Sequence, residues 1–145
     1  MKILFRKLHP EAQVPQYQTA GSAGLDLHAR ISHEIYLQPG VRFTCPTGIA
    51  IELPEGFEAQ VRPRSGFAIK HGVTLVNGIG CVDSDYRGEV CALLINHGDQ
   101  AFKIEPNMRI AQLVIAPVIR AELVQAGELS DTERGNGGFG HTGSQ

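Results

Sequence analysis

The sequence contains no tryptophan, and only 6% of its residues are aromatic. It has no run near the roughly 18 consecutive apolar residues that a membrane-spanning helix needs. The first ten residues carry Arg6 and Lys7 inside their only apolar run, which argues against a signal peptide. The net charge is only −2, so no strong overall field attracts nucleic acid or a membrane surface. We therefore expect a soluble cytoplasmic protein that binds neither nucleic acid nor a membrane.

Patterns that bind metals or build disulfide frameworks are also missing. The three cysteines, Cys45, Cys81 and Cys91, are odd in number and form no C-x-x-C pair, which argues against disulfides and a structural zinc site. The six histidines form no H-E-x-x-H motif. No G-K-[ST] sequence occurs, so a Walker A loop is excluded. We expect reduced, buried cysteines and no transition metal held by the protein alone.

Glycine is present in excess, at 17 of 145 residues, which is about 12% against a usual roughly 7%. Short β-branched or aliphatic runs alternate with Gly, Pro and Asn turn signals, and this pattern is typical of an antiparallel sandwich or barrel. Strand-like runs cover residues 35–37, 48–53, 57–62, 73–76, 89–95 and 110–118. Only residues 65–71 predict a short helix. The length suits one domain, so the sequence predicts a single all-β domain.

The last fifteen residues differ from the rest, because they contain five glycines and one large apolar residue, Phe139. Such a segment buries too little surface to offset its ordering entropy, so we expect a flexible arm over residues 131–145 beside a core over residues 1–130. Gly135, Gly137 and Gly140 match the dinucleotide-binding pattern G-x-G-x-x-G, but the preceding strand and following helix of that fold are absent from the pattern. The alternative is a frayed chain end, but fraying gives no reason for Arg134 and Phe139 to stand among the glycines.

Five segments combine charged, polar and glycine residues. They are A-G-L-D-L at 23–27, P-R-S-G at 63–66, V-D-S-D-Y-R-G-E at 82–89 with Asn77 and Gly78 before it, R-I-A-Q-L-V at 109–114, and R-G-N-G-G-F-G-H-T-G at 134–143. Taken singly, each is also explained as a turn, a cap or a solvated hairpin tip. In this order and spacing they resemble the five motifs of the trimeric deoxyuridine triphosphatase (dUTPase) family. The resemblance implies a distorted β jelly roll and a homotrimer with active sites at subunit interfaces. It also implies Mg²⁺-dependent hydrolysis of dUTP to dUMP and pyrophosphate, which removes dUTP from the nucleotide pool and supplies dUMP for thymidylate synthesis.

The resemblance also implies a role for single residues. Asp83 is expected to be the general base for water attack at the α-phosphate, and Asp26 to meet Mg²⁺ through water. Phosphate contacts are implied for Arg64, Ser65, Gly66, Gln112, Arg134, Gly138, His141 and Thr142. Uracil and deoxyribose contacts are implied for Asn77, Gly78, Gly80, Val82, Tyr86 and Phe139. In these last contacts Tyr86 packs on the deoxyribose, and Phe139 stacks on the uracil as the arm closes over a neighbouring subunit's site.

Two departures and two alternatives accompany this interpretation. Cys81 stands where the family commonly has threonine, and His141 where it commonly has serine. A dCTP deaminase shares the fold, but it carries a catalytic glutamate in the strand after the third motif, where this chain has Leu93. A catalytically idle jelly roll that senses nucleotides or binds proteins is the other alternative. The presence of Asp26, Asp83 and the full arm argues against it, while a second, regulatory role stays open.

Overall fold

The structure of the protein is a computed structural model that describes residues 1–138. Strands dominate the described range, and its single helix covers the predicted residues, so the all-β prediction is confirmed. In chain order the elements are β1 (Leu4–Lys7), β2 (Leu25–His28), β3 (Ile35–Leu37), β4 (Arg42–Pro46), β5 (Ile49–Glu52), β6 (Phe57–Pro63), α1 (Ser65–His71), β7 (Val73–Leu75), β8 (Gly80–Val82), β9 (Cys91–Asn96), β10 (Phe102–Ile104) and β11 (Arg109–Pro117).

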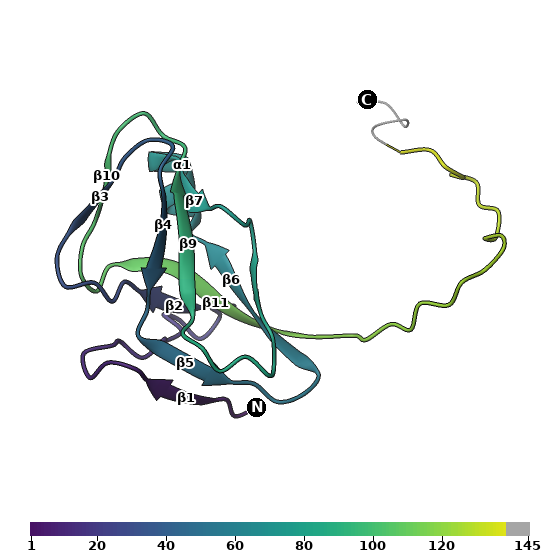
Figure 1. The fold of residues 1–145 in the computed structure, drawn as a ribbon, viewed down its shortest axis with the longest axis horizontal. Helices are drawn as coiled ribbons and strands as arrows, with labels where there is room; N and C mark the ends of the chain where they lie inside the picture. Colours follow the sequence, from purple (N-terminus) through teal and green to yellow (C-terminus); the bar gives the residue numbers. More distant parts are fainter. Residues whose placement is uncertain (139–145) are drawn as a thin grey trace.

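The described strands form four sheets, and every strand pair is antiparallel. A four-stranded sheet has the order β2-β11-β6-β8, and a three-stranded sheet has the order β4-β9-β7. Two smaller sheets pair β1 with β5 and β3 with β10. Within residues 1–138, no strand pairs with the strand that follows it in the chain, and the described sheets do not close into a barrel (Figure 1). The jelly-roll prediction therefore holds without the closed barrel.

The hydrophobic core lies between the two larger sheets. Val61 of β6 and Leu113 of β11 belong to the same buried cluster as Cys45 of β4 and Leu94 of β9. Ala59 and Val61 of β6 both face this core, because alternate side chains of a strand point to the same face of the sheet. Removing a side chain such as Leu94 from water contributes about 1.5–3 kcal/mol. The core thus fixes the four-stranded sheet, which carries the predicted site residues Asp26, Gly80, Val82 and Gln112.

All three cysteines are free thiols. Cys45 is buried, as expected, while Cys91 is only half-buried. The expectation of burial is wrong for Cys81, which is exposed. Cys81 pairs with Gln60 across β8 and β6, so it lies on the sheet face that does not carry Val61.

Beyond Pro117 the described chain forms neither helix nor strand, and it runs away from the sheets (Figure 1, green to yellow). Ile119, Leu123 and Leu129 are exposed at 93%, 96% and 89%. No part of residues 1–138 covers these apolar side chains. Within residues 1–138, no helix is long and apolar enough to cross a membrane.

Candidate active site

A cleft of about 210 Å³ lies beside β8 and the loop that follows it. The predicted residues that line it are Asn77, Gly80, Val82, Asp83 and Tyr86. The structure therefore brings together the side chain predicted as general base and those predicted to contact the base and sugar. Gly78 is not part of this lining; it forms the turn between β7 and β8, where its N–H donates to the carbonyl oxygen of Leu75 at 3.1 Å.

Gly80 leaves room for the Asn77 amide. A Cβ built at position 80 would lie 3.1 Å from Nδ2 of Asn77 and 3.4 Å from Cβ of Val61. Both distances are closer than most real Cβ contacts, so a side chain here would push the amide away. The glycine thus keeps the Asn77 donor and acceptor pair at the mouth of the cleft.

Tyr86 is anchored by its own loop. Its hydroxyl donates to the carbonyl oxygen of Glu89 at 3.1 Å, and the Glu89 carboxylate accepts the Gly48 N–H at 2.6 Å. Glu89, Cys91 and Leu93 also line the cleft, although sequence reasoning did not assign them to the site. For Cys91 and Leu93 the available signal was their alternate positions in a predicted strand, because every second residue of a strand points to the same side.

A second group of predicted residues meets around Asp26. This carboxylate is 2% exposed, and it accepts hydrogen bonds from Nη1 of Arg109 at 3.1 Å and Nε2 of Gln112 at 3.3 Å. The Arg109 carbonyl in turn accepts a hydrogen bond from Nη1 of Arg64 at 2.9 Å. One network therefore joins the first, second and fourth motifs. Sequence reasoning missed Arg109 as a site residue, because its partner Asp26 lies 83 positions away in the chain.

Ser65 and Gly66 are exposed in the first turn of α1, directly after Arg64. The Arg64 guanidinium carbon lies 5.1 Å from the ring centroid of Phe67. Arg64 is therefore held by the Arg109 carbonyl and by an aromatic face, while its remaining N–H groups stay available.

His28 lies two residues after Asp26 on β2, and its environment lowers its pKa. Burial lowers the pKa of His28; the Asp26 carboxylate opposes that shift, and the guanidinium groups of Arg109 and Arg64 add to it. Its Nδ1 is buried and has no hydrogen-bond partner among residues 1–138. These surroundings disfavour the charged imidazolium relative to a free histidine.

The two groups of residues do not line the same cleft. Gln112 pairs with both Asp26 and Arg62, and cross-strand partners project to the same face, so the Asp26 group gathers on one face of the four-stranded sheet. The cleft beside β8 is lined by neither Asp26, Arg109 nor Gln112. In one chain, the predicted general base and the Asp26 group are thus not arranged around a shared cleft.

Asp26 fits a magnesium ion that is held mainly by its substrate. Among residues 1–138, no three His, Cys, Asp or Glu side chains gather into a metal-binding group. Magnesium usually keeps several waters and takes one or two protein carboxylates together with phosphate oxygens. Each Asp26 oxygen accepts one of the two hydrogen bonds above and retains a second acceptor position for a metal-bound water.

The predicted arm residues are only partly described. Nε of Arg134 donates to the Gly137 carbonyl at 2.8 Å, and the Gly137 N–H donates back to the Arg134 carbonyl at 3.0 Å. This local turn lies beyond the exposed segment that leaves the sheets, and Gly138 follows it at the end of the described range. The predicted contacts of Phe139, His141 and Thr142 fall outside the described residues.

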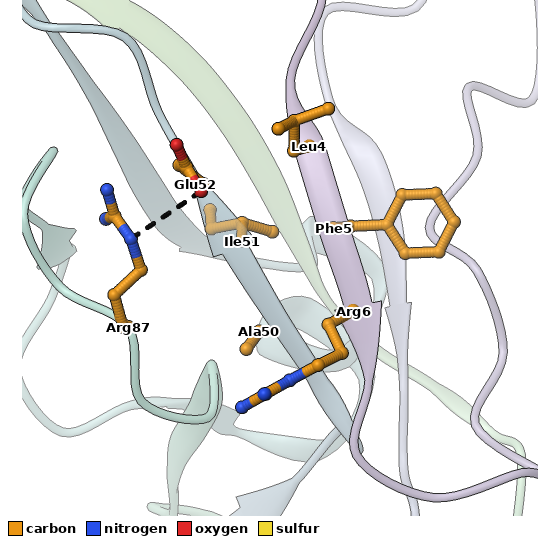
Figure 2. Close-up of a pocket in the computed structure, with 7 residues that line it drawn as sticks. All are labelled: Leu4, Phe5, Arg6, Ala50, Ile51, Glu52 and Arg87. Atoms are coloured by element: carbon orange, nitrogen blue, oxygen red, sulfur yellow. Dashed lines mark ion pairs between the residues drawn. The ribbon is translucent and has the colours of Figure 1, made fainter.

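Another hollow, of about 310 Å³, lies between β1 and β5 and holds none of the predicted site residues. Figure 2 shows Arg6 and Arg87 reaching toward it, while Phe5 points away. Arg87 lies 3.9 Å from the Glu52 carboxylate in an exposed ion pair, which contributes little to stability. This hollow is therefore a surface feature of the small β1–β5 sheet.

Comparisons with known proteins agree with this geometry. A model of the dUTPase family matches residues 10–143. The deoxyuridine 5'-triphosphate nucleotidohydrolase of Nautilia profundicola is 54% identical over 143 residues, covering 99% of each chain. That of Chlamydia pneumoniae is 55% identical over 142 residues, covering 97% of this chain and 98% of the relative. The dUTPase of Staphylococcus bacteriophage 80alpha, solved with dUPNHPP, has a TM-score of 0.88 at 25% identity and 98% coverage of both chains.

Proposed function

The chain belongs to the dUTPase family, and on that premise we propose that it is a dUTP diphosphatase that releases pyrophosphate and dUMP from dUTP with Mg²⁺. In the cell this reaction removes dUTP from the nucleotide pool and supplies dUMP for thymidylate synthesis. The observation that carries the proposal is the cleft that places the Asp83 carboxylate beside Asn77 and Tyr86.

Asp83 acts as the general base. It accepts a proton from a water molecule, whose oxygen attacks the α-phosphorus of dUTP. The bond from that phosphorus to the oxygen bridging the α- and β-phosphates breaks, and pyrophosphate leaves. The exposed position of Asp83 at the cleft supports this role, because the carboxylate is accessible to both water and substrate.

The triphosphate is neutralised by positioned donors rather than by covalent chemistry. In the core these donors are Arg64, Ser65, Gly66 and Gln112. Those of the arm are Arg134, Gly138, His141 and Thr142. The network through Arg109 supports the assignment of Arg64 and Gln112, because it fixes both side chains in one place.

Magnesium, when bound on the triphosphate, supplies further charge neutralisation. Asp26 would hold the ion's water molecules through its remaining acceptor positions. Arg109 and Gln112 hold the Asp26 carboxylate in place, since both donate hydrogen bonds to it.

The cleft beside β8 selects the base and the sugar. Asn77 and the backbone from Gly78 to Val82 pair with the uracil edge, and a mismatched base would leave buried polar groups unpaired. Tyr86 packs on the deoxyribose and excludes a 2'-hydroxyl. Phe139 of the arm stacks on the uracil.

A homotrimer completes the site. The cleft beside β8 is lined by none of Asp26, Arg64 and Gln112, so one substrate meets both groups of site residues where two different chains come together. The exposed Ile119, Leu123 and Leu129 support this arrangement, because another subunit would cover them. We propose a jelly-roll core over residues 1–130 and an arm over residues 131–145 that closes on a neighbouring subunit's site.

A dCTP deaminase is the nearest alternative on this fold. Leu93 of β9 lines the cleft beside β8, which we call the nucleoside cleft. It stands at the position where the deaminases carry their catalytic glutamate. An apolar side chain there provides no proton transfer for deamination, so hydrolysis of dUTP is favoured.

Pyrophosphate release from dUTP, dCTP, dTTP and UTP tests the proposal. We expect the wild-type chain to cleave dUTP at a rate well above the other three, and to lose that activity when EDTA removes Mg²⁺. Asp83→Asn should reduce kcat by roughly 10²–10⁴-fold, the usual contribution of a general base. Asp99→Asn is the matched control, because Asp99 is an exposed aspartate in the β9–β10 loop. Equal turnover of dCTP, or full activity of Asp83→Asn, would contradict the proposal.

A further inference from the structure

Phe67 occupies the position directly after the P-R-S-G segment, and its ring faces the Arg64 guanidinium. The guanidinium carbon lies 5.1 Å from the ring centroid, within the roughly 6 Å range of a cation–π contact. Arg64 stands immediately before α1, and its side chain makes no capping hydrogen bond to the helix. Its described side-chain contacts are thus the Phe67 ring and the Arg109 carbonyl.

Two further aromatic rings pack against the Phe67 ring. The ring of Phe102 on β10 packs edge-on against it, with centroids 4.9 Å apart, and the His71 ring lies 6.4 Å away. Phe102 is 8% exposed and belongs to the core cluster. The end of α1 is tied to the β9–β10 loop, where the His97 N–H donates to the Gly72 carbonyl at 2.9 Å. The aromatic face under Arg64 is therefore fixed to the core.

Two supports of different kinds restrict the guanidinium. The hydrogen bond to the Arg109 carbonyl fixes one nitrogen, Nη1. The negative face of the aromatic ring attracts the cation and restricts the orientation of the guanidinium group. Both supports leave the other N–H donors free for an anion.

We propose that Phe67 is a positioning residue that holds the Arg64 guanidinium in the orientation required for the triphosphate. The proposal rests on the proposed function, because it assigns Arg64 to the substrate's phosphates. Phe67 does not touch the substrate; it acts through Arg64. An aliphatic side chain of similar size fills the same space, but it lacks the π face.

The test is a double-mutant cycle on kcat/KM for dUTP. Phe67→Leu should lower kcat/KM by about two- to five-fold in the wild-type background, which is the size of an exposed cation–π contact. In an Arg64→Gln background the same substitution should have no effect, because the cation is gone. Phe67→Tyr keeps the ring and should retain the wild-type value.

Phe57→Leu is the matched control, since Phe57 is a half-buried phenylalanine at the opposite end of β6 from Pro63. It should leave kcat/KM unchanged. The melting temperature and assembly state of each variant are measured alongside, and Phe67→Met replaces Phe67→Leu if the latter does not fold.

Two results overturn the proposal while leaving the proposed function intact. One is a wild-type kcat/KM for folded Phe67→Leu. The other is an equal loss in both backgrounds, which would show that Phe67 acts on helix packing alone. A wild-type chain that does not hydrolyse dUTP overturns the proposed function and this proposal together.

Discussion

Gly88 shows how a single missing side chain shapes the nucleoside cleft. A Cβ built at position 88 would collide with the hydroxyl end of the Tyr86 ring, and it would lie 2.9 Å from the ring atom Cε2. Because the Tyr86 ring is 45% exposed, it has room to move away from such a side chain. Gly88 therefore determines where the ring stands.

We expect Gly88→Ala to displace the Tyr86 ring and to weaken discrimination against a ribose. The ratio of kcat/KM for dUTP to that for UTP should fall on the order of tenfold, a typical value for a lost shape contact in a pocket. Steady-state kinetics on both nucleotides measure this ratio. Gly127→Ala is the control, because a Cβ at position 127 meets nothing within 4 Å. An unchanged ratio in folded Gly88→Ala would show that Tyr86 does not select the sugar.

Cys45 predicts a pH dependence of stability. Burial raises the pKa of its thiol to about 12, against an ordinary value of 9.0 in the unfolded chain. Above pH 9 the unfolded state binds fewer protons at this site than the folded state, so stability falls as the pH rises from about 9 to about 12. Each pH unit in this window changes the unfolding equilibrium up to about tenfold.

Cys45→Ala removes this titrating group, and its free energy of unfolding should decline less steeply above pH 9 than that of the wild type. Urea unfolding at a series of pH values measures the slope. At neutral pH the variant should be somewhat less stable, because it leaves a small cavity in the core. If both proteins lose stability equally above pH 9, the Cys45 thiol is not the group responsible.

Residues of one short motif are easier to place together from the sequence than contacts between distant motifs. Asn77, Asp83 and Tyr86 belong to one short motif, and the structure places them in one cleft. The hydrogen bond from Arg109 to Asp26 joins residues 83 positions apart. Such a contact depends on strand pairing, which local sequence patterns do not contain.

Among the elements, the helix and several strands were predictable. The helix at Ser65–His71 and the strand at Ile35–Leu37 match the predicted ranges, and β11 shifts by one residue at each end. The prediction missed β1, β2, β4, β8 and β10, which are three to five residues long. Short strands have few alternating positions, so they are predicted only where turn signals mark their ends, as Pro39-Gly40 and Asn77-Gly78 do for β3 and β7.

The pairing of strands was not predictable at all. Every described pair joins strands that are not consecutive in the chain, such as β2 with β11. No hairpin turn fixes their register, so the partners are selected by burial in the common core.

We expect the activity to depend on the arm, while the stability of the fold does not depend on it. The described strands end at Pro117, and the contacts of Arg134 are local. A chain that ends at Leu129 should keep its melting temperature within a few degrees and remain trimeric. Its kcat/KM for dUTP should fall by at least about a hundredfold, because several phosphate donors and the lid are lost.

Calorimetry, light scattering and pyrophosphate release measure the three properties of the truncated chain. Arg134→Ala in the full-length chain provides the matched point substitution and should show part of the loss. Full activity after truncation would show that residues 130–145 take no part in the reaction.

At the scale of the whole molecule, the proposed site needs more than one chain. In one chain, the cleft beside β8 is lined by neither Asp26, Arg64 nor Gln112. The sequence resemblance implies sites at subunit interfaces, and this separation supports that proposal. The strand register maintains the separation, because a shift of one residue would move Asp26 to the other face of its sheet.

Mixing two inactive variants tests this arrangement. Asp83→Asn damages the nucleoside half of the site, and Arg64→Gln damages the phosphate half. If the halves come from different subunits, a mixed trimer contains sites that take an intact half from each variant. With random assembly, about a quarter of all sites are intact.

The decisive measurement is pyrophosphate release from dUTP after the two variants are unfolded together and refolded at equal concentrations. We expect activity near a quarter of the wild-type value, while each variant refolded alone stays nearly inactive. Mixed trimers that form but show no more activity than the two variants alone would contradict the interface site, because each chain would then supply both halves of its own site.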